Sequence, residues 1–418
     1  MQSAANAPIQ LRKSVHIGSL MDIVYLDLLQ NYCLPNTELV VEWNALGKFR
    51  EKDDTLSRDN MKKLFNHLTG IINANLGEET KAWHFLDDHP KTLEITEQLV
   101  QELLKRDLAY FHEYQAHFCE QCNSYLAPKQ FEIERCKNCG SKPITKTAFD
   151  IFVKSDKNLM LEHLSLARFE PAYTRHKFME TFKIMPNAYA ITKTRNFGFS
   201  AENFHPKLVG KKFDPKFVAS LFPIILERLD RPPLASLVIG EDILGRYLYY
   251  LFANGCLFNM RPLNIYVHGL LSDQGKKISK YNHLPISVDI SNFLGKWSWD
   301  HLRLLCLSSK FGKNIDFQKK LVDVTKLIIK RHNVLMFLNS VSPKYRLAEK
   351  THELENLIIK HCSDLLKLLS EFEWFEFYKG YRALWFELLS RQYISSIKNG
   401  EASKNGINMI LKAIKRLP

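Results

Sequence analysis

Four of the eight cysteines in the chain are spaced like the ligands of one metal ion. Cys119 and Cys122 form one CxxC pair, Cys136 and Cys139 form another, and thirteen residues separate the pairs. Two such pairs let four thiolates close tetrahedrally on a zinc ion, and four protein ligands leave no open position for water. The predicted zinc is therefore structural. Four reduced thiols or two disulfides are the alternatives, and a cytosolic location disfavours the disulfides.

A second candidate for chemistry is a glycine-bearing turn near the start of the chain. His16 and Gly18 lie directly before Ser19–Leu29, a stretch with apolar residues at helical spacing. A glycine lets the backbone approach a phosphate, and a helix N-terminus offers amide donors and a favourable dipole. Alone, this pattern is more typical of an ordinary turn with a hydrogen-bonded histidine, so its meaning depends on the rest of the chain.

A third candidate is a lysine-dense loop. An apolar strand ends at His268–Gly269, a turn follows at Asp273–Gly275, and Lys276, Lys277 and Lys280 come next. Mobile lysines of this kind can stabilise the charge that develops on a leaving pyrophosphate. On composition alone, a plain surface loop is the favoured alternative.

The overall charge favours a polyanionic partner. Lysines and arginines number 58 against 45 acidic residues, which gives a net charge of +13, and cationic side chains gain by displacing counterions from phosphates. Part of the excess lies in Lys310–Arg331 and Lys398–Arg416, although each run is also typical of a solvated helix face. The sequence has no signal-peptide pattern and no apolar run of about 18 residues, so a cytoplasmic protein without a membrane partner is expected.

The elements that must position these residues alternate between strand and helix, which predicts an α/β fold with a parallel sheet. Strands are expected at Glu38–Trp43, Ala188–Thr192, Leu237–Ile239 and Leu263–Val267. Helices are expected at Ser19–Leu29, Leu93–Leu108 and Glu241–Asn254, and a small ribbon at His112–Lys146. From Trp299 onward the pattern is helical, most clearly at Val322–Leu338, Glu353–Phe372 and Trp385–Ile397. Cys33, Cys256, Cys306 and Cys362 are expected to be core thiols.

Taken in order, these segments resemble the signature motifs of class I aminoacyl-tRNA synthetases of the methionyl and leucyl subgroup. His16–Ser19 resembles the HIGH motif, and Lys277–Tyr281 resembles KMSKS. Four further matches lie between or after them: Glu42–Gly47 resembles GWDAFG, Ile191–Gly198 the ISR-x-x-x-WG segment, Ile239–Ile243 IGKDI, and Trp299–Arg303 the D-x-L-R segment. The six matches are collinear and span roughly residues 8 to 320.

The resemblance implies a Rossmann-like (HUP-type) parallel-sheet catalytic domain with an inserted zinc ribbon and a C-terminal α-helical bundle. Residues 1–110 would form the first half of the core, 111–165 the zinc-ribbon connective insertion, 166–295 the second half with the KMSKS-like loop, and 296–418 a helical domain like those that bind anticodons. The insertion has no room for a large editing domain, so none is expected. The helical part is short for this subgroup, which leaves anticodon recognition open.

The resemblance also implies an activity, the formation of an aminoacyl-adenylate from ATP and an amino acid with Mg²⁺ present. His16, Lys277 and Lys280 would be catalytic. The residues expected to bind ATP are His16, Gly18, Ser19, Gly240, Asp242, His268, Lys277, Ser279 and Lys280. Trp43, Asn44 and Phe197 would line the amino-acid pocket, and the metal ligands would be Cys119, Cys122, Cys136 and Cys139.

Several positions depart from the family pattern. Ser19 replaces the second histidine of HIGH, Ile278 and Tyr281 replace residues of KMSKS, and Phe197 replaces a tryptophan. Asn44 stands where the family has an aspartate that holds the α-ammonium of the substrate, and an amide supplies no full charge.

Three functions therefore stay open. The first is a compact tRNA synthetase of methionyl or leucyl type. The second is a paralogue that transfers the activated acid to a small molecule or carrier. The third is a degenerate protein that binds nucleotide or RNA without turnover, and retention of Lys277, Ser279 and Lys280 argues against it.

Overall fold

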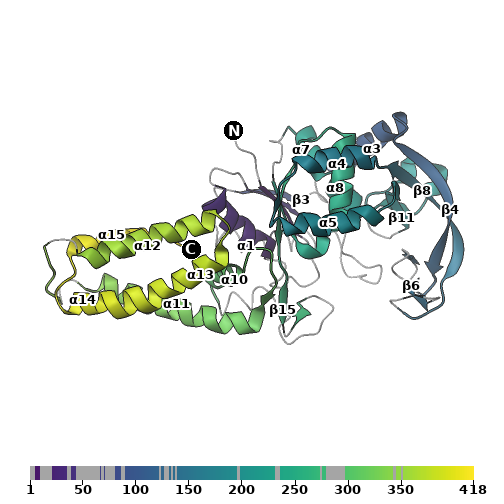
Figure 1. Cartoon of the computed structure of the whole chain (residues 1–418). Helices are drawn as coiled ribbons and strands as arrows, with labels where there is room; N and C mark the ends of the chain where they lie inside the picture. Colours follow the sequence, from purple (N-terminus) through teal and green to yellow (C-terminus); the bar gives the residue numbers. More distant parts are fainter. Residues whose placement is uncertain are drawn as a thin grey trace.

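The computed structural model describes residues 5–9, 21–34, 39–43, 66, 70, 81–85, 90–121, 124–126, 131–132, 135–136, 139–194, 198–230, 236–273, 275–278, 297–341, 345–349 and 352–418. Only the backbone is described for residues 5–9, 39–43, 81–85, 90, 124, 131–132, 246 and 277. A parallel sheet lies in the middle of the molecule, a helical bundle extends to one side, and a long β-hairpin forms the opposite edge (Figure 1).

The central sheet has six strands that pair only in parallel. The strands are β1 (Ala5–Ile9), β2 (Leu39–Trp43), β3 (Lys81–Phe85), β9 (Phe169–Glu170), β13 (Ser236–Gly240) and β14 (Asn264–His268), in the order β3-β2-β1-β13-β14-β9. The sequence patterns had predicted β2, β13 and β14, and all three are confirmed within one residue. The chain runs outward from β1 through β2 to β3, and its later strands lie on the other side of β1: first β9 at the far edge, then β13 and β14. In open α/β sheets, ligands bind at the carboxyl ends of the strands on either side of such a reversal.

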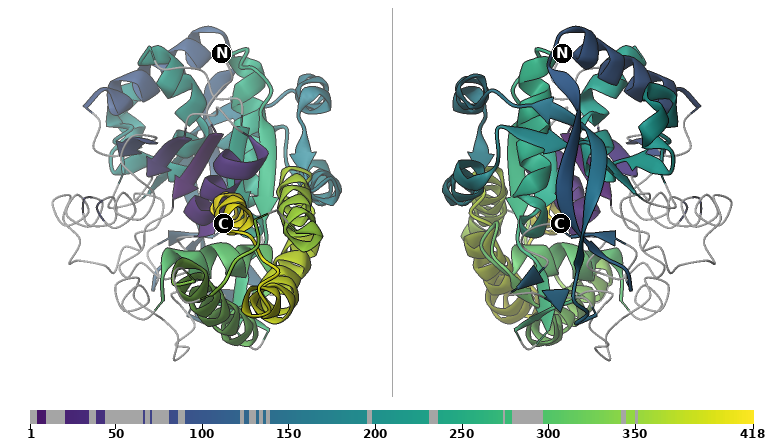
Figure 2. Two further views of the ribbon diagram at one scale, coloured as in Figure 1. Left: turned by 90° about the vertical axis from the view of Figure 1, so that its left-hand side faces the viewer. Right: turned by 90° about the vertical axis from the view of Figure 1, so that its right-hand side faces the viewer.

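Helices cover both faces of this sheet, so strands β13 and β14 are buried on both sides. On one face, Val238 of β13 and Tyr266 of β14 pack with helix α1 (Met21–Leu28) in one hydrophobic cluster. On the other face, Ile239 and Val267 pack with helix α8 (Arg246–Leu257). Successive side chains of a strand point to opposite faces of the sheet, so adjacent residues pack in opposite helical layers. Both layers can be followed in Figure 2.

Three further helices surround the core of the α8 layer. Helix α3 (Pro90–Lys105) confirms the helix expected at Leu93–Leu108, and α4 (Lys157–Leu166) and α5 (Tyr173–Ile184) pack in the same cluster. The short helices α6 (Pro215–Ser220) and α7 (Phe222–Arg228) complete this layer.

Two predicted elements are wrong in their extent. The helix expected at Glu241–Asn254 begins as a 3₁₀ turn, η9 (Glu241–Ile243), and α8 starts only at Arg246, because Gly245 has φ −75° and ψ −100°, outside the helical region. The strand expected at Ala188–Thr192 is two strands, β10 (Ala188–Ala190) and β11 (Thr192–Thr194). The chain changes partner between them.

A second sheet contains the metal-ligand candidates. Strands β4 (Ala109–Cys119) and β8 (Ile144–Lys154) form a long antiparallel hairpin, flanked by β10 and by β5 (Ser124–Tyr125) in the order β10-β8-β4-β5. Strand β11 pairs instead with β12 (Lys211–Phe213). A small hairpin, β6 (Phe131–Glu132) and β7 (Arg135–Cys136), lies at the end of the long one (Figure 1). The ribbon expected at His112–Lys146 is therefore the tip of a longer hairpin.

The last third of the chain is helical, as predicted. It comprises α10 (Trp299–Leu307), α11 (Phe317–Asn339), α12 (Glu353–Ser370), α13 (Trp374–Ala383), the π-helical segment η10 (Leu384–Tyr393), α14 (Ile394–Lys398) and α15 (Lys404–Ile414). We call residues 299–414 the helical region. Its core is continuous with α1, which lies between the sheet and the bundle (Figures 1 and 2). In the described part of the chain, no helix is long and apolar enough to cross a membrane.

The lysine-dense loop begins on a small three-stranded sheet. Strand β15 (Leu271–Asp273) pairs antiparallel with β16 (Lys276–Lys277) and parallel with β17 (Ile315–Asp316). Gly275 sits at the turn with φ +78°, a conformation that glycine adopts without strain. This confirms the predicted hairpin tip and ties the start of the loop to the helical region.

Candidate nucleotide site and cysteine cluster

The carboxyl edge of the sheet brings three predicted ATP-binding residues together. Gly240 ends β13 and is paired in register with His268, which ends β14. A Cβ atom on Gly240 would lie 2.9 Å from the Asp242 carboxylate and 3.3 Å from the His268 ring. The missing side chain thus lets Gly240, Asp242 and His268 share one small volume, at the edge where ligands of such sheets bind.

His268 is buried at this edge, and both of its ring nitrogens lie within hydrogen-bond distance of oxygen atoms. Its Nε2 lies 2.5 Å from Oδ1 of Asp22, and its Nδ1 lies 2.8 Å from the carbonyl oxygen of Gly269. Burial lowers the pKa of His268, but the Asp22 carboxylate raises it, and Asp242 adds to the rise, so the net pKa lies above the ordinary 6.5. Both ring nitrogens face acceptors, so both donate in the imidazolium form. In that protonated form the ring would present a positive charge at the edge where ligands of such sheets bind.

Two residues of helix α1 contact His268, and the sequence patterns did not predict either contact. Asp22 lies in the first turn of α1, and Tyr25 stacks on the His268 ring with centroids 4.6 Å apart and planes 13° apart. Asp22 is 246 residues from His268, and no local pattern joins them. The nearest signal is their position, because α1 directly follows the His16–Ser19 segment.

Most of the other predicted site residues lie outside the described residues. These are His16, Gly18, Ser19, Asn44, Phe197, Ser279 and Lys280. Trp43 ends β2, and Lys277 ends β16, and for both only the backbone is described. The parallel pairing places the carboxyl ends of β1, β2, β13 and β14 on one edge, so Trp43 shares that edge with Gly240 and His268. The roles of all these residues remain predictions.

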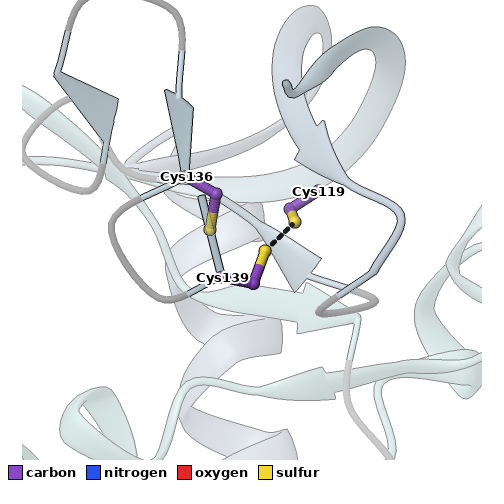
Figure 3. A group of neighbouring side chains, drawn as sticks. All are labelled: Cys119, Cys136 and Cys139. Atoms are coloured by element: carbon purple, nitrogen blue, oxygen red, sulfur yellow. Dashed lines mark hydrogen bonds between the residues drawn. The ribbon is translucent and has the colours of Figure 1, made fainter. Parts of the chain in front are cut away.

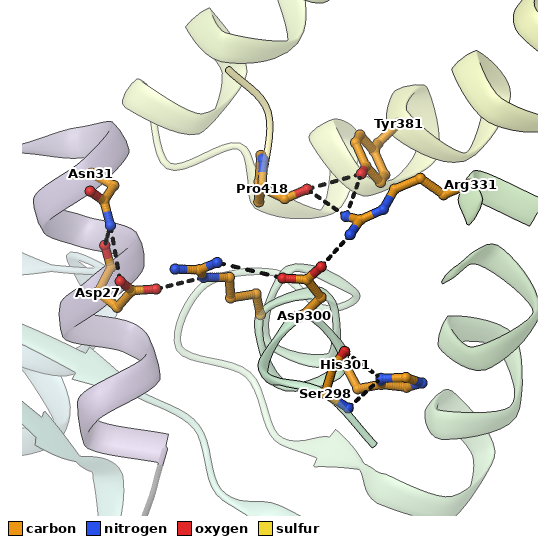
Figure 4. A network of polar contacts seen from close by, with 9 residues as sticks. Asp27, Asn31, Ser298, Asp300, His301, Arg331, Tyr381 and Pro418 are labelled. Atoms are coloured by element: carbon orange, nitrogen blue, oxygen red, sulfur yellow. Dashed lines mark hydrogen bonds and ion pairs between the residues drawn. The ribbon is translucent and has the colours of Figure 1, made fainter. Parts of the chain in front are cut away.

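Helix α1 is held to the helical region by a chain of ion pairs (Figure 4). Arg303 Nε donates to Oδ2 of the buried Asp27 at 2.7 Å, and its Nη1 lies 3.5 Å from Oδ1 of Asp300. Arg331 of α11 binds the same Asp300 and also donates to the Tyr381 hydroxyl. Asp300 and Arg303 belong to the segment that resembles D-x-L-R. Through these contacts the two residues join α1, α10 and α11.

Three of the four predicted metal ligands cluster at the tip of the long hairpin (Figure 3). The sulfurs of Cys119, Cys136 and Cys139 all lie within 4.8 Å of one another. Ser141 Oγ lies 2.8 Å from the Cys139 sulfur and 3.2 Å from that of Cys119. Three convergent thiols match the sulfur ligands that zinc prefers in proteins. A bound zinc ion would crosslink the tip of the hairpin, and its binding free energy would stabilise the fold of this segment. Cys122 lies outside the described residues.

The four cysteines outside this cluster confirm the expectation of core thiols in part. Cys306 and Cys362 are buried, whereas Cys33 and Cys256 are only partly buried. Burial raises the pKa of the Cys33 thiol to about 12 and that of Cys362 to about 11, so both are unreactive at neutral pH.

Comparison with known proteins gives a consistent result. The sequence matches no family model. It is 24% identical over 240 residues to a methionine–tRNA ligase of Leptospira interrogans, a match that covers 47% of this chain and only 33% of the ligase. The chain therefore spans about a third of the length of that curated relative.

Solved structures match over nearly the whole chain. Methionyl-tRNA synthetase of Mycobacterium tuberculosis, in complex with methionyl-adenylate, superposes with a TM-score of 0.73 at 12% identity, covering 100% of this chain and 92% of that one. A LeuRS of Agrobacterium radiobacter K84, in a ternary complex with tRNA and LeuAMS, gives 0.69 at 11% identity, covering 99% and 83%. Identities this low establish fold alone. The chain thus has the fold of the class I aminoacyl-tRNA synthetases of the methionyl and leucyl type, which is the family that its motifs resemble.

Proposed function

We propose that this protein activates an amino acid with ATP to form an aminoacyl-adenylate and transfers the acyl group to tRNA. The observation that carries the proposal is the convergence of Gly240, Asp242 and the buried His268 on the carboxyl edge of the sheet, beside its point of reversal. This is where a nucleotide binds in sheets of this topology. The collinear HIGH-like and KMSKS-like segments support the same reaction.

In the proposed reaction, the substrate carboxylate attacks the α-phosphorus of ATP and pyrophosphate leaves. His16, Lys277 and Lys280 would bind the phosphate oxygens and stabilise the negative charge that grows on them, so catalysis is mainly positioning and electrostatics. By the resemblance, Gly240 and Asp242 would lie at the adenosine end of the bound ATP. Mg²⁺, arriving with ATP, would neutralise part of the triphosphate charge.

The amino-acid pocket would include Trp43, Asn44 and Phe197, and methionine and leucine are the first substrates to test. The departures at Ser19 and Asn44 favour a second candidate function, in which the adenylate serves a small-molecule or carrier acceptor instead of tRNA. Zinc at Cys119, Cys122, Cys136 and Cys139 would have no part in either reaction beyond stabilising the insertion.

The test is ATP–pyrophosphate exchange with each of the twenty amino acids and a few non-protein acids, followed by charging of total tRNA. Exchange with one acid would identify the substrate, and acylation of tRNA would favour the first function over the second. An RNA acceptor further predicts that binding weakens steeply as salt rises, since several phosphates are neutralised together. Absence of exchange with every acid would contradict the proposal.

A variant of the lysine loop tests the mechanism. Lys280→Ala should lower the exchange rate at least about a hundredfold, the loss typical when one transition-state donor is removed, without changing the thermal unfolding temperature. Lys326→Ala is the matched control, because Lys326 is an exposed lysine on the surface of α11. An unchanged rate in Lys280→Ala would remove the loop from the mechanism.

A further inference from the structure

Three aromatic rings from distant parts of the chain form a stack in which Tyr25 contacts the other two. His268 of the nucleotide edge stacks on Tyr25 of α1, and Tyr25 stacks on Trp374 of α13 with centroids 5.3 Å apart and planes 16° apart. All three side chains are buried, with exposed fractions of 3%, 0% and 1%. Closely packed, buried side chains therefore connect the helical region to the candidate ATP site.

The rings cannot shift independently. Phe311 meets Tyr25 edge-on at 5.7 Å and Trp374 edge-on at 4.8 Å, so it fills the space beside the stack. Protein interiors are packed as densely as organic crystals, and a displaced ring displaces its neighbours. A change at Trp374 is therefore transmitted to Tyr25.

The plane of His268 decides where its two N–H groups point. One faces Asp22 and the other faces the Gly269 carbonyl, and the face of the ring is fixed by Tyr25. If Tyr25 tilts, the His268 ring loses either its stacking or its alignment with Asp22. Either loss moves the ring beside Gly240 and Asp242.

Helix α1 is anchored to the helical region a second time. Asp27, two residues after Tyr25, is bound by Arg303 of α10 at 2.7 Å. This ion pair keeps α1 in place when the stack alone is altered. A substitution in the stack should therefore affect the His268 ring more than it affects the fold.

We propose that Trp374 is a positioning residue for ATP: through Tyr25 it fixes the His268 ring, so that the helical region determines the affinity of the sheet edge for the nucleotide. The inference rests on the proposed function, because it takes the site of Gly240, Asp242 and His268 to be the ATP site.

Three variants test the proposal. Trp374→Leu removes the ring, and Trp374→Phe restores an aromatic ring in its place. Trp385→Leu is the matched control, because Trp385 is equally buried in the same helical region but packs against Tyr381 rather than Tyr25. Affinity for ATP is measured directly by calorimetry, KM and kcat by pyrophosphate exchange, and stability by thermal unfolding.

We expect Trp374→Leu to weaken ATP binding and raise the KM for ATP by about three- to tenfold, the range set by loss of one aromatic pair, with a smaller change in kcat. Trp374→Phe should recover most of the affinity. Trp385→Leu should lose comparable thermal stability and bind ATP within about twofold of the unaltered protein, since it does not touch the stack.

Equal ATP affinities for Trp374→Leu and Trp385→Leu would overturn the proposal, as would a Trp374→Phe variant no better than Trp374→Leu. If the unaltered protein binds ATP but exchanges no pyrophosphate, the proposed function fails, and the affinities of the variants still decide the role of Trp374. If the unaltered protein does not bind ATP, both are overturned.

Discussion

The free energy of unfolding should depend strongly on the buried ion pair between Lys211 of β12 and Asp150 of β8. The Lys211 Nζ lies 2.9 Å from Oδ1 of Asp150, and the two side chains are only 9% and 4% exposed. Asp150 also accepts hydrogen bonds from Thr192 at 2.8 Å and from Tyr114 at 3.0 Å. This network joins β11 to the long hairpin that carries the cysteine cluster.

Replacing Lys211 with Met should cost about 3–5 kcal/mol of the free energy of unfolding at neutral pH, because a buried carboxylate then lacks its cation. The double variant Asp150→Asn with Lys211→Met should recover most of this loss, since the amide oxygen can still accept from Thr192 while the amide N–H group donates to the Tyr114 hydroxyl oxygen. The assay is urea unfolding followed by far-UV circular dichroism.

An exposed ion pair between Glu113 of the same hairpin and Lys207, which lies outside it, gives the control. Lys207 lies 2.7 Å from Glu113, but the side chains are 59% and 50% exposed, so Lys207→Met should cost less than about 1 kcal/mol. Two results would refute the reasoning. One is a Lys211→Met variant no less stable than Lys207→Met, and the other is a double variant no more stable than Lys211→Met.

Two further predictions concern the metal and the buried histidine. Cys136→Ser should reduce bound zinc well below one ion per chain and lower the stability of the insertion, while the control Cys256→Ser should keep the metal. The zinc content is measured by elemental analysis after dialysis. Equal zinc contents in the two variants would show that the cluster does not bind the metal. The raised pKa of His268 gives stability that is fully present below its unfolded value of 6.5 and is lost as pH rises through the folded pKa. Asp22→Asn should therefore destabilise the protein most near pH 5.5 to 6.5 and progressively less at higher pH, as measured by urea unfolding across that range; a cost that stays constant would contradict the pairing.

Features that depend on short stretches of chain could be predicted from sequence. Apolar residues at helical spacing predicted α11 and α12, and short apolar runs predicted β13 and β14. Asp273–Gly275 predicted the turn of β15 and β16, because a glycine there can adopt positive φ. The CxxC spacing predicted that thiols would converge, and three of them do. In each case the residues that decide the structure lie within a few positions of one another.

The extent of some elements could not be predicted, because local pattern and tertiary packing disagree. The apolar spacing continues unbroken from Glu241 to Asn254, yet Gly245 leaves the helical region and delays α8. The run from Ala188 to Thr192 is continuous in sequence, but Ile191 donates its N–H to Ile151 and the chain then turns to pair with β12. Which strand a segment joins is decided by partners that lie elsewhere in the chain.

The sequence by itself determined the order of motifs, the class of fold and the residue types that chemistry would need. Only the tertiary structure decided that Asp22 pairs with His268, that Lys211 pairs with Asp150, and that Trp374 contacts the nucleotide edge through Tyr25. These contacts join residues separated by tens to hundreds of positions. Their energies come from burial and exact geometry, which no periodicity along the chain records.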